Sequence, residues 1–88
     1  MRIGMKRYGE VLVTPKEGEE AFYSADENFF QALKEDESII LDFIKVRVLS
    51  PSWLDEFVTR IKEKYTNKIE FHNTENESVS LSIKIVLS

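Results

Sequence analysis

Cysteine is absent from this chain, and histidine occurs only once, at His72. The lack of cysteine excludes disulfides, thiolate metal sites and cysteine nucleophiles. A single histidine also excludes a multi-histidine metal site. We therefore expect a protein that uses no metal and no cofactor and that is not an enzyme.

Long apolar runs and an excess of basic residues are also lacking. No segment approaches the roughly 20 apolar residues of a membrane helix. The N-terminal segment MRIGMKRYGE has no apolar stretch of the kind that follows the basic residues of a secretory signal. Lys and Arg number 12 against 16 Asp and Glu, a net charge of −4, which disfavours binding to the phosphates of nucleic acids. We expect a cytoplasmic protein that binds neither membranes nor nucleic acids.

The composition is that of a small globular protein. Hydrophobic residues make up 42% of the 88 positions and charged residues 32%, which suits a packed core under a soluble surface. The chain contains no repeats, no low-complexity tracts and no linker. One domain over residues 1–88 is therefore predicted.

Three segments have the pattern of strands. They are the short Glu10–Val13, the continuous apolar run Ile39–Phe43 and the alternating Lys68–His72. Lys45–Val48 alternates like an extended segment that leaves the sheet. The tail over 77–87 leaves strand and helix open. Alternation favours a strand, but one helical face would collect Val79, Ile83, Val86 and Leu87. Strands that alternate with helices predict an α/β sandwich, with a mostly parallel sheet and helices packed on it.

The first helix is predicted from about Pro15 to Lys34. Thr14 begins a capping box, and apolar residues recur beyond it at helical spacing. Gly18 costs about 1 kcal/mol inside a helix. A second capping box at Ser24 leaves open a hairpin turn over residues 15–18, followed by a helix that begins at Ser24.

The second helix has the clearest pattern in the chain. Ser50 suits the N-cap and Pro51 the first helical position. Glu56 and Arg60 form an i,i+4 pair in the favoured order. One apolar stripe is formed by Leu54, Phe57, Val58, Ile61 and Tyr65.

Three segments together resemble a known family. GEVLVTPKEGEEAF, ILDFIKVRVLSPSWLDEF and KIEFHNTENESV resemble the STAS-like domains of unknown function found in bacteria and archaea. These domains are similar in turn to the STAS fold, named for sulphate transporters and anti-sigma factor antagonists. The resemblance implies a C-terminal helix over 77–87, and so the element order β-α-β-α-β-α. Such domains usually carry glycine where this chain has Lys45, which suggests a looser turn there.

The resemblance also places a regulatory loop at the start of the second helix. Anti-sigma factor antagonists carry an Asp-Ser-Ser/Thr-Gly motif there, and a kinase phosphorylates its first serine. In this chain the aspartate becomes Ser50, the phosphorylated serine becomes Pro51, the next serine is Ser52 and the glycine becomes Trp53. Phosphorylation at that position is therefore not carried over, and a shifted acceptor at Ser50 or Ser52 remains as a hypothesis.

Each candidate residue of this junction has a structural and a functional interpretation. Ser50 is either an N-cap alone or a phosphoacceptor. Trp53 either packs over the strand ends or is an exposed anchor for a partner protein. Asp55 and Glu56 point about 100° apart on a helix, so they are not a converging acid–base pair and instead suit an acidic recognition surface.

Asp42 is the one charged residue in the apolar run Ile39–Phe43. An unpaired carboxylate would be costly there. We expect it to lie at the C-terminal end of the strand and to accept hydrogen bonds from the region Ser50–Trp53. Because parallel sheets place ligands at that end, a small-ligand or nucleotide sensor around Asp42 is one functional hypothesis.

The sequence thus predicts a non-catalytic regulatory domain that binds a partner protein. The contact surface would comprise Pro51, Trp53, Asp55 and Glu56, and the resemblance suggests an ATPase- or kinase-like regulator as the partner. The alternatives are a serine-phosphorylated switch and a nucleotide sensor.

Overall fold

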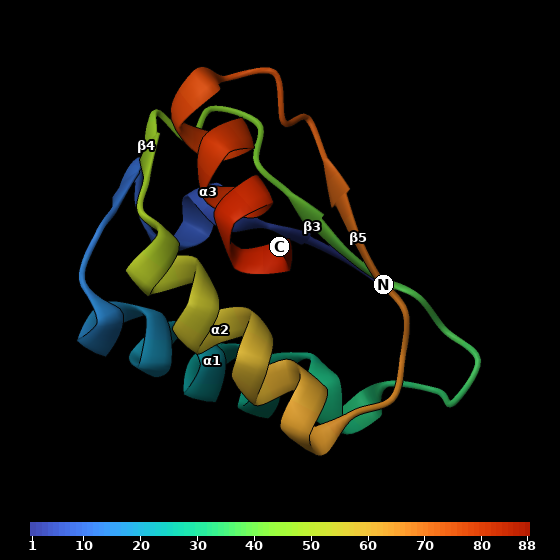
Figure 1. The fold of residues 1–88 in the computed structure, drawn as a ribbon. Helices are drawn as coiled ribbons and strands as arrows, with labels where there is room; N and C mark the ends of the chain where they lie inside the picture. Colours follow the sequence, from blue (N-terminus) through green and yellow to red (C-terminus); the bar gives the residue numbers. More distant parts are fainter.

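A three-stranded parallel sheet forms one side of the protein (Figure 1). The computed structural model describes all of residues 1–88. The strands are β1 (Arg2–Gly4), β3 (Ile39–Asp42) and β5 (Ile69–His72), in the spatial order β1-β3-β5. Ile3 pairs with Leu41, which in turn pairs with Phe71. Ile3 and Leu41 are buried in the core. The strand predicted at Ile39–Phe43 is therefore present, but its alternate residues, Ile40 and Asp42, are only partly buried.

A second, two-stranded sheet lies apart from the first. β2 (Val11–Leu12) pairs in parallel with β4 (Val48–Leu49). The strand predicted at Glu10–Val13 is therefore real, but it pairs with the segment that was expected only to leave the sheet. The strand β1 was not predicted, because its three residues contain only one apolar side chain and so show no alternation.

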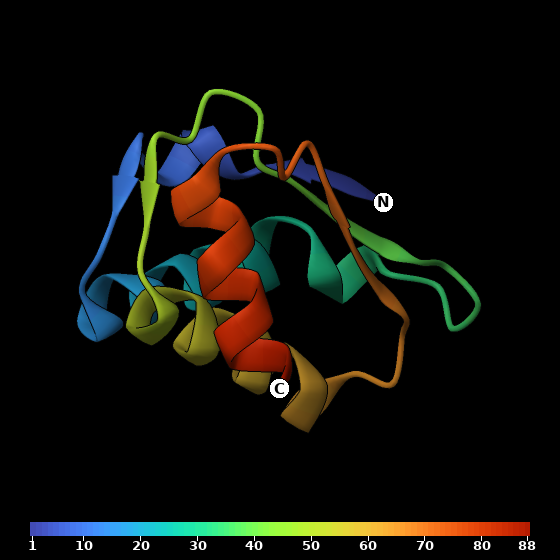
Figure 2. The same cartoon turned by 45° about the horizontal axis from the view of Figure 1, so that its top comes forward.

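Three helices complete the α/β architecture, which confirms the predicted fold class. They are α1 (Pro15–Asn28), α2 (Pro51–Lys64) and α3 (Glu77–Leu87), with short 3-10 helices η1 (Met5–Tyr8) and η2 (Phe30–Ala32). None of the helices has both the length and the apolar character that crossing a membrane requires. Helices α1 and α2 run side by side, and α3 packs against α2 and β4 (Figures 1 and 2).

The predicted first helix proved too long at its C-terminal end. Thr14 caps α1 through a hydrogen bond from the Glu17 amide to its hydroxyl, 3.2 Å long, as the capping box implied. The helix passes through Ser24 without interruption, so the alternative start at Ser24 was wrong. It ends at Asn28, because Phe29 leaves helical geometry at φ −130° and ψ −53° before η2 begins.

The C-terminal segment is a helix, as the resemblance implied. Asn76 caps it by accepting a 3.1 Å hydrogen bond from the Val79 amide. Val79 and Ser82 are buried against the body of the protein. Leu87, which the pattern puts on the same helical face as Val79, is half exposed at the end of the helix. Alternation could not identify this helix because its apolar residues lie on more than one face.

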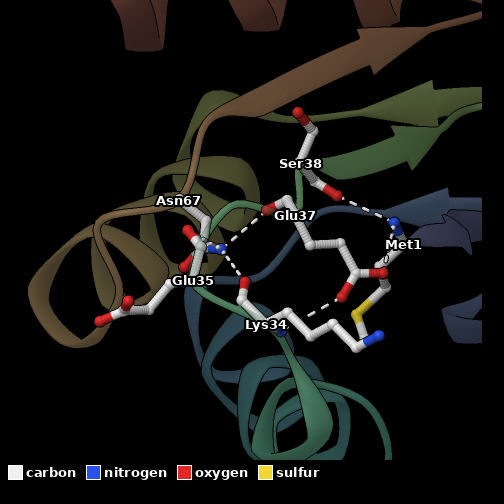
Figure 3. A network of polar contacts seen from close by, with 6 residues as sticks. All are labelled: Met1, Lys34, Glu35, Glu37, Ser38 and Asn67. Carbon is white, nitrogen blue, oxygen red and sulfur yellow. Dashed lines mark hydrogen bonds and ion pairs between the residues drawn. The ribbon is translucent and has the colours of Figure 1, made fainter.

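The side chain of Asn67, just before β5, holds the loop that leads into β3 (Figure 3). Its Nδ2 atom donates to the carbonyl oxygens of Lys34, Glu35 and Glu37, at 2.7, 3.2 and 2.7 Å. The Glu37 carboxylate accepts from the backbone amide of Lys34 and pairs with the amino group of Met1. The polar turn over 35–38 is thereby held in one conformation at the entry to β3.

The turn that follows β3 contains Lys45 in a left-handed conformation. Its φ is +65°, and the Val46 amide closes the turn by donating to the Phe43 carbonyl at 3.0 Å. The expectation of a looser turn, which rested on the missing glycine, was therefore wrong. The backbone keeps a geometry that favours glycine and carries the cost of a Cβ atom, about 1–2 kcal/mol.

Replacing Lys45 by glycine should therefore stabilise the protein by about 0.5 kcal/mol. The relief of the left-handed Cβ contact exceeds the larger entropy that glycine gives to the unfolded chain. Urea unfolding measures the difference. Lys45→Ala is the matched control, because it removes the charge but keeps the Cβ atom and should give no gain. If the glycine variant were no more stable than the alanine variant, the left-handed backbone conformation of Lys45 would not be the source of the cost.

Candidate functional site

The junction between β4 and α2 is fixed by the hydroxyl of Ser50. The Ser50 Oγ accepts a 3.1 Å hydrogen bond from the Trp53 amide, which makes Ser50 the N-cap, and Pro51 opens the helix. The same hydroxyl donates to the Val13 carbonyl, at the end of β2, at a distance of 2.5 Å. One side chain therefore caps α2 and attaches it to the segment that precedes α1.

Removing the Ser50 hydroxyl should cost about 1–2 kcal/mol, because both hydrogen bonds are lost and the α2 amide is left without its cap. Thermal or urea unfolding of Ser50→Ala measures this cost. Ser52→Ala provides the control, since Ser52 is exposed on the first turn and its loss should change stability by no more than about 0.5 kcal/mol. Equal effects of the two variants would argue against the capping role.

Trp53 lies in the core, with 1% of its surface exposed. Its ring stacks on Phe57 at 5.3 Å between centroids and contacts Tyr8 at 6.2 Å. The interpretation of Trp53 as an exposed anchor was therefore wrong, because the ring packs inside the protein against aromatic side chains of η1 and α2. The reason is the close approach of α1. An added Cβ at Gly18 would lie 2.4 Å from the Trp53 carbonyl oxygen, so α1 covers this turn of α2 directly.

The acidic residues of α2 lie in different environments. Asp55 is exposed and accepts a hydrogen bond from the Thr59 hydroxyl at 3.1 Å. Glu56 pairs with Arg60 at 2.9 Å, as predicted from the i,i+4 spacing. Arg60 also contacts Glu19 of α1 at 2.5 Å, so Glu56 belongs to a bridge between the two helices. Of the two predicted acids, Asp55 is the one left without an ion pair.

An open groove of about 310 Å³ runs between the start of α2 and the end of α3. Its lining residues are Pro51, Ser52, Asp55, Ile85 and Val86. The structure thus brings three of the predicted site residues together with a helix that sequence reasoning had not linked to the site. On the exposed surface of α3, Leu81 and Ile85 are 50% and 60% exposed at i,i+4 spacing. The sequence did contain a signal for this surface. The C-terminal segment has more apolar residues than a single buried helix face can accommodate.

The position of α3 beside α2 is set by hydrogen bonds to β4. The Ser78 hydroxyl contacts both the amide and the carbonyl of Leu49, at 3.0 and 3.1 Å. The buried Ser82 hydroxyl donates to the same carbonyl at 2.5 Å. Because Leu49 directly precedes the N-cap Ser50, these contacts attach α3 to the residue that leads into α2, and so set the position of the groove's two walls.

Asp42 lies at the C-terminal end of β3, as predicted, but its partners are different from those expected. Its carboxylate accepts hydrogen bonds from Asn73 at 2.7 Å, the Ile44 amide at 3.0 Å and Arg2 at 3.0 Å. The hydrogen bond from Asn73 is the main reason that the pKa of Asp42 is lowered. The Ser50–Trp53 region cannot reach it, because β3 ends between β1 and β5, whereas α2 follows β4 in the other sheet.

Comparison with known proteins places this architecture in a family. The sequence profile of a family described as a STAS-like domain of unknown function matches residues 27–79. The chain belongs to this family. The matched segment begins in α1 and ends in α3, so it contains β3, β4, α2 and β5, with Ser50 and the start of α2 near its middle. No curated protein and no solved structure matches this STAS-like domain.

Nothing in the site of the STAS-like domain has the geometry of a metal centre. No group of three or more His, Cys, Asp or Glu side chains lies close enough together to hold an ion. The single histidine, His72, contacts Glu70 at 3.2 Å on β5. The residues that converge at the α2–α3 groove are apolar, hydroxyl-bearing and acidic.

Proposed function

We propose that this STAS-like domain is a non-catalytic regulatory module that binds a partner protein at the groove between α2 and α3. The observation that carries the proposal is the exposed apolar side chain of Ile85, which lines the groove together with Pro51, Ser52 and Asp55 at the start of α2. Leu81, one turn earlier on α3, is exposed as well. Apolar residues of this size on a surface with a polar rim are typical of protein contacts.

The charge of the groove indicates the chemistry of the partner. Asp55 is its only charged lining residue, and Glu63 lies with Asp55 on the neighbouring face of α2. A partner segment with apolar side chains flanked by lysine or arginine would complement this surface. The regulator suggested by the resemblance, an ATPase- or kinase-like protein, is the first class to test.

Affinity purification followed by measurement with the purified partner tests the proposal. Ile85→Lys should weaken binding by about tenfold or more, as expected when an apolar residue central to an interface is replaced by a charge. Ile44→Lys is the matched control, because Ile44 is 53% exposed in the turn after β3 and lies outside the groove. Equal affinity of the Ile85 variant and the unmodified protein would show that the contact lies elsewhere.

Phosphorylation is a second candidate, and the exposure of the two serines favours Ser52. The Ser50 hydroxyl is engaged with Val13 and Trp53, whereas Ser52 is exposed in the groove. A phosphate there would lie near the positive N-terminal end of α2 and would be opposed by Asp55. Intact mass after incubation with a cognate kinase should show one phosphate, lost in Ser52→Ala and kept in Ser50→Ala. Phosphate on another residue would rule the idea out.

The nucleotide-sensor hypothesis remains a third proposal with less support. The Asp42 carboxylate already accepts three hydrogen bonds, and it lines none of the three surface clefts of the protein. A shift of the melting temperature by nucleotides that is lost in Asp42→Asn would support it, and a flat response would not.

A further inference from the structure

Strand β5 lies at an edge of the main sheet and has free backbone groups on its outer side. It ends the spatial order β1-β3-β5 (Figure 1). The carbonyls of Lys68 and His72 accept backbone hydrogen bonds from the β3 side, at 2.8 and 3.0 Å. Because successive backbone groups of a strand point to opposite edges, the amides and carbonyls of Ile69 and Phe71 point away from β3. No turn, loop or cap hydrogen bond reaches them.

The other strand edges are covered or shorter. Side chains of α3 cover the outer edge of β4, where they bond the backbone of Arg47 and Leu49. β2 has two residues, and β1 has three and passes directly into η1. Natural proteins commonly protect edge strands with proline, with a bulge or with a covering segment. β5 has four residues in continuous register with β3 and contains no proline, so it is the edge best able to pair with another strand.

The apolar side chains of β5 are incompletely buried on the core face of the sheet. Ile39 and Leu41 of β3 are 0% exposed, whereas their register partners Ile69 and Phe71 are only partly buried. The difference arises because the sheet ends at β5. A further strand at this edge would cover both side chains and would pair their free backbone groups.

We propose that β5 pairs in antiparallel orientation with β5 of a second copy of this chain, which joins the two sheets into one. Such a dimer has a two-fold axis. With the axis at Glu70, Ile69 of each copy lies opposite Phe71 of the other. Both residues carry free amides and carbonyls, so each of these pairs exchanges both of its N–H···O bonds. Apolar side chains then meet across the junction on the core face.

The charges on the outer face of β5 favour a second copy as the occupant. Glu70 and His72 contact each other at 3.2 Å on this face, and Lys68 precedes them at the same two-residue spacing. In the antiparallel pairing, Lys68 of each copy lies diagonal to Glu70 of the other, within reach of its carboxylate. The two Glu70 side chains face each other at the axis, each flanked by its own histidine and the other copy's lysine. The strand thus complements itself when reversed.

The contact involves one short strand from each copy, so the dimer should dissociate on dilution. Sedimentation velocity over a concentration series up to millimolar should show a monomer–dimer equilibrium. Hydrogen exchange followed by NMR should locate the contact. The amides of Ile69 and Phe71 should become protected only at high concentration, whereas those of Glu70 and His72, which face β3, should be protected at every concentration.

Reversing the charge of Lys68 tests the register. Lys68→Glu should weaken the dimer by about three- to tenfold, because each diagonal pair becomes repulsive and the symmetry counts the loss twice. Lys62→Glu is the matched control, since it makes the same change at an exposed position of α2. It should change the dissociation constant by less than about twofold, because separated surface charges are screened by salt.

Removing an outward amide tests the edge itself. Ile69→Pro should abolish the dimer but keep the fold, because the missing amide does not bond β3 and the first residue of an edge strand tolerates proline. Circular dichroism checks the fold of this variant. Ile69→Ala shortens the side chain but keeps the amide, so it should dimerise more tightly than the proline variant.

Four outcomes would overturn the proposal. The chain could stay monomeric at millimolar concentration, or it could dimerise while the amides of Ile69 and Phe71 stay unprotected. Equal weakening by Lys68→Glu and Lys62→Glu would contradict the antiparallel register. If these amides became protected only when a purified partner was added, β5 would accept a strand of that partner instead of a second copy. No residue of β5 lines the α2–α3 groove, so this proposal and the proposed function can fail separately.

Discussion

Replacing Gly18 by alanine should destabilise the domain by about 2–3 kcal/mol, even though the same change usually stabilises a helix by about 1 kcal/mol. The new Cβ would lie 2.4 Å from the carbonyl oxygen of Trp53 and 3.1 Å from its carbonyl carbon. These are backbone atoms of the first turn of α2, which cannot rotate away. Helix α1 would have to move off α2, and the packing around Trp53 would loosen.

Urea unfolding followed by circular dichroism measures this effect, and Trp53 fluorescence reports on the local packing. Gly4→Ala is the matched control, since a Cβ at Gly4 would meet nothing within 4 Å. The backbone there is extended, at φ −75° and ψ 111°, so the control should be neutral or slightly stabilising. An unchanged or raised stability of Gly18→Ala would contradict the close contact of the two helices.

Replacing Asn67 by aspartate should cost about 2–3 kcal/mol, although the two side chains have nearly the same shape. The amide nitrogen that donates to the carbonyls of Lys34, Glu35 and Glu37 would become a carboxylate oxygen. Those carbonyls would lose their donor and face a negative charge. Unpaired groups of this kind cost about 1–3 kcal/mol.

The loss of stability in Asn67→Asp should become smaller at low pH. Below about pH 4 the new carboxyl group takes up a proton and becomes a donor again, so the difference from the unmodified protein should shrink there. Asn28→Asp makes the same chemical change at an exposed position, where the amide contacts only the Ser24 hydroxyl. Its effect should stay below about 1 kcal/mol. A deficit at Asn67 that does not change with pH would contradict the donor role.

Local patterns predicted the elements that have a strong signal of their own. The stripe from Leu54 to Tyr65 identified α2, and the serine–proline pair identified its start, because capping and amphipathic spacing are local effects. The run Ile39–Phe43 identified β3 for the same reason. β1 was not predicted, because a strand of three residues with one buried side chain shows no periodicity.

The contacts that decide the site depend on how the elements cross, and no local pattern contains that information. Gly18 had been interpreted as a weak point of its helix, yet it permits the contact that buries Trp53. Asp42 was assigned partners from α2, but its neighbours come from β1 and from the turn after β5. The exposed side chains of α3 became relevant only once that helix was placed beside Pro51 and Asp55.

The pairing of the strands has a consequence for the rate of folding. Every pair is parallel, and the paired residues are separated by 38, 37 and 30 positions, as in Arg2 with Ile40, Val11 with Val48 and Ile39 with Ile69. No hairpin can form early, because each pairing must first close a long loop. Proteins dominated by such distant contacts fold more slowly than helical bundles of similar size. During synthesis on the ribosome, β1 and β2 therefore remain unpaired until β3 and β4 have been made.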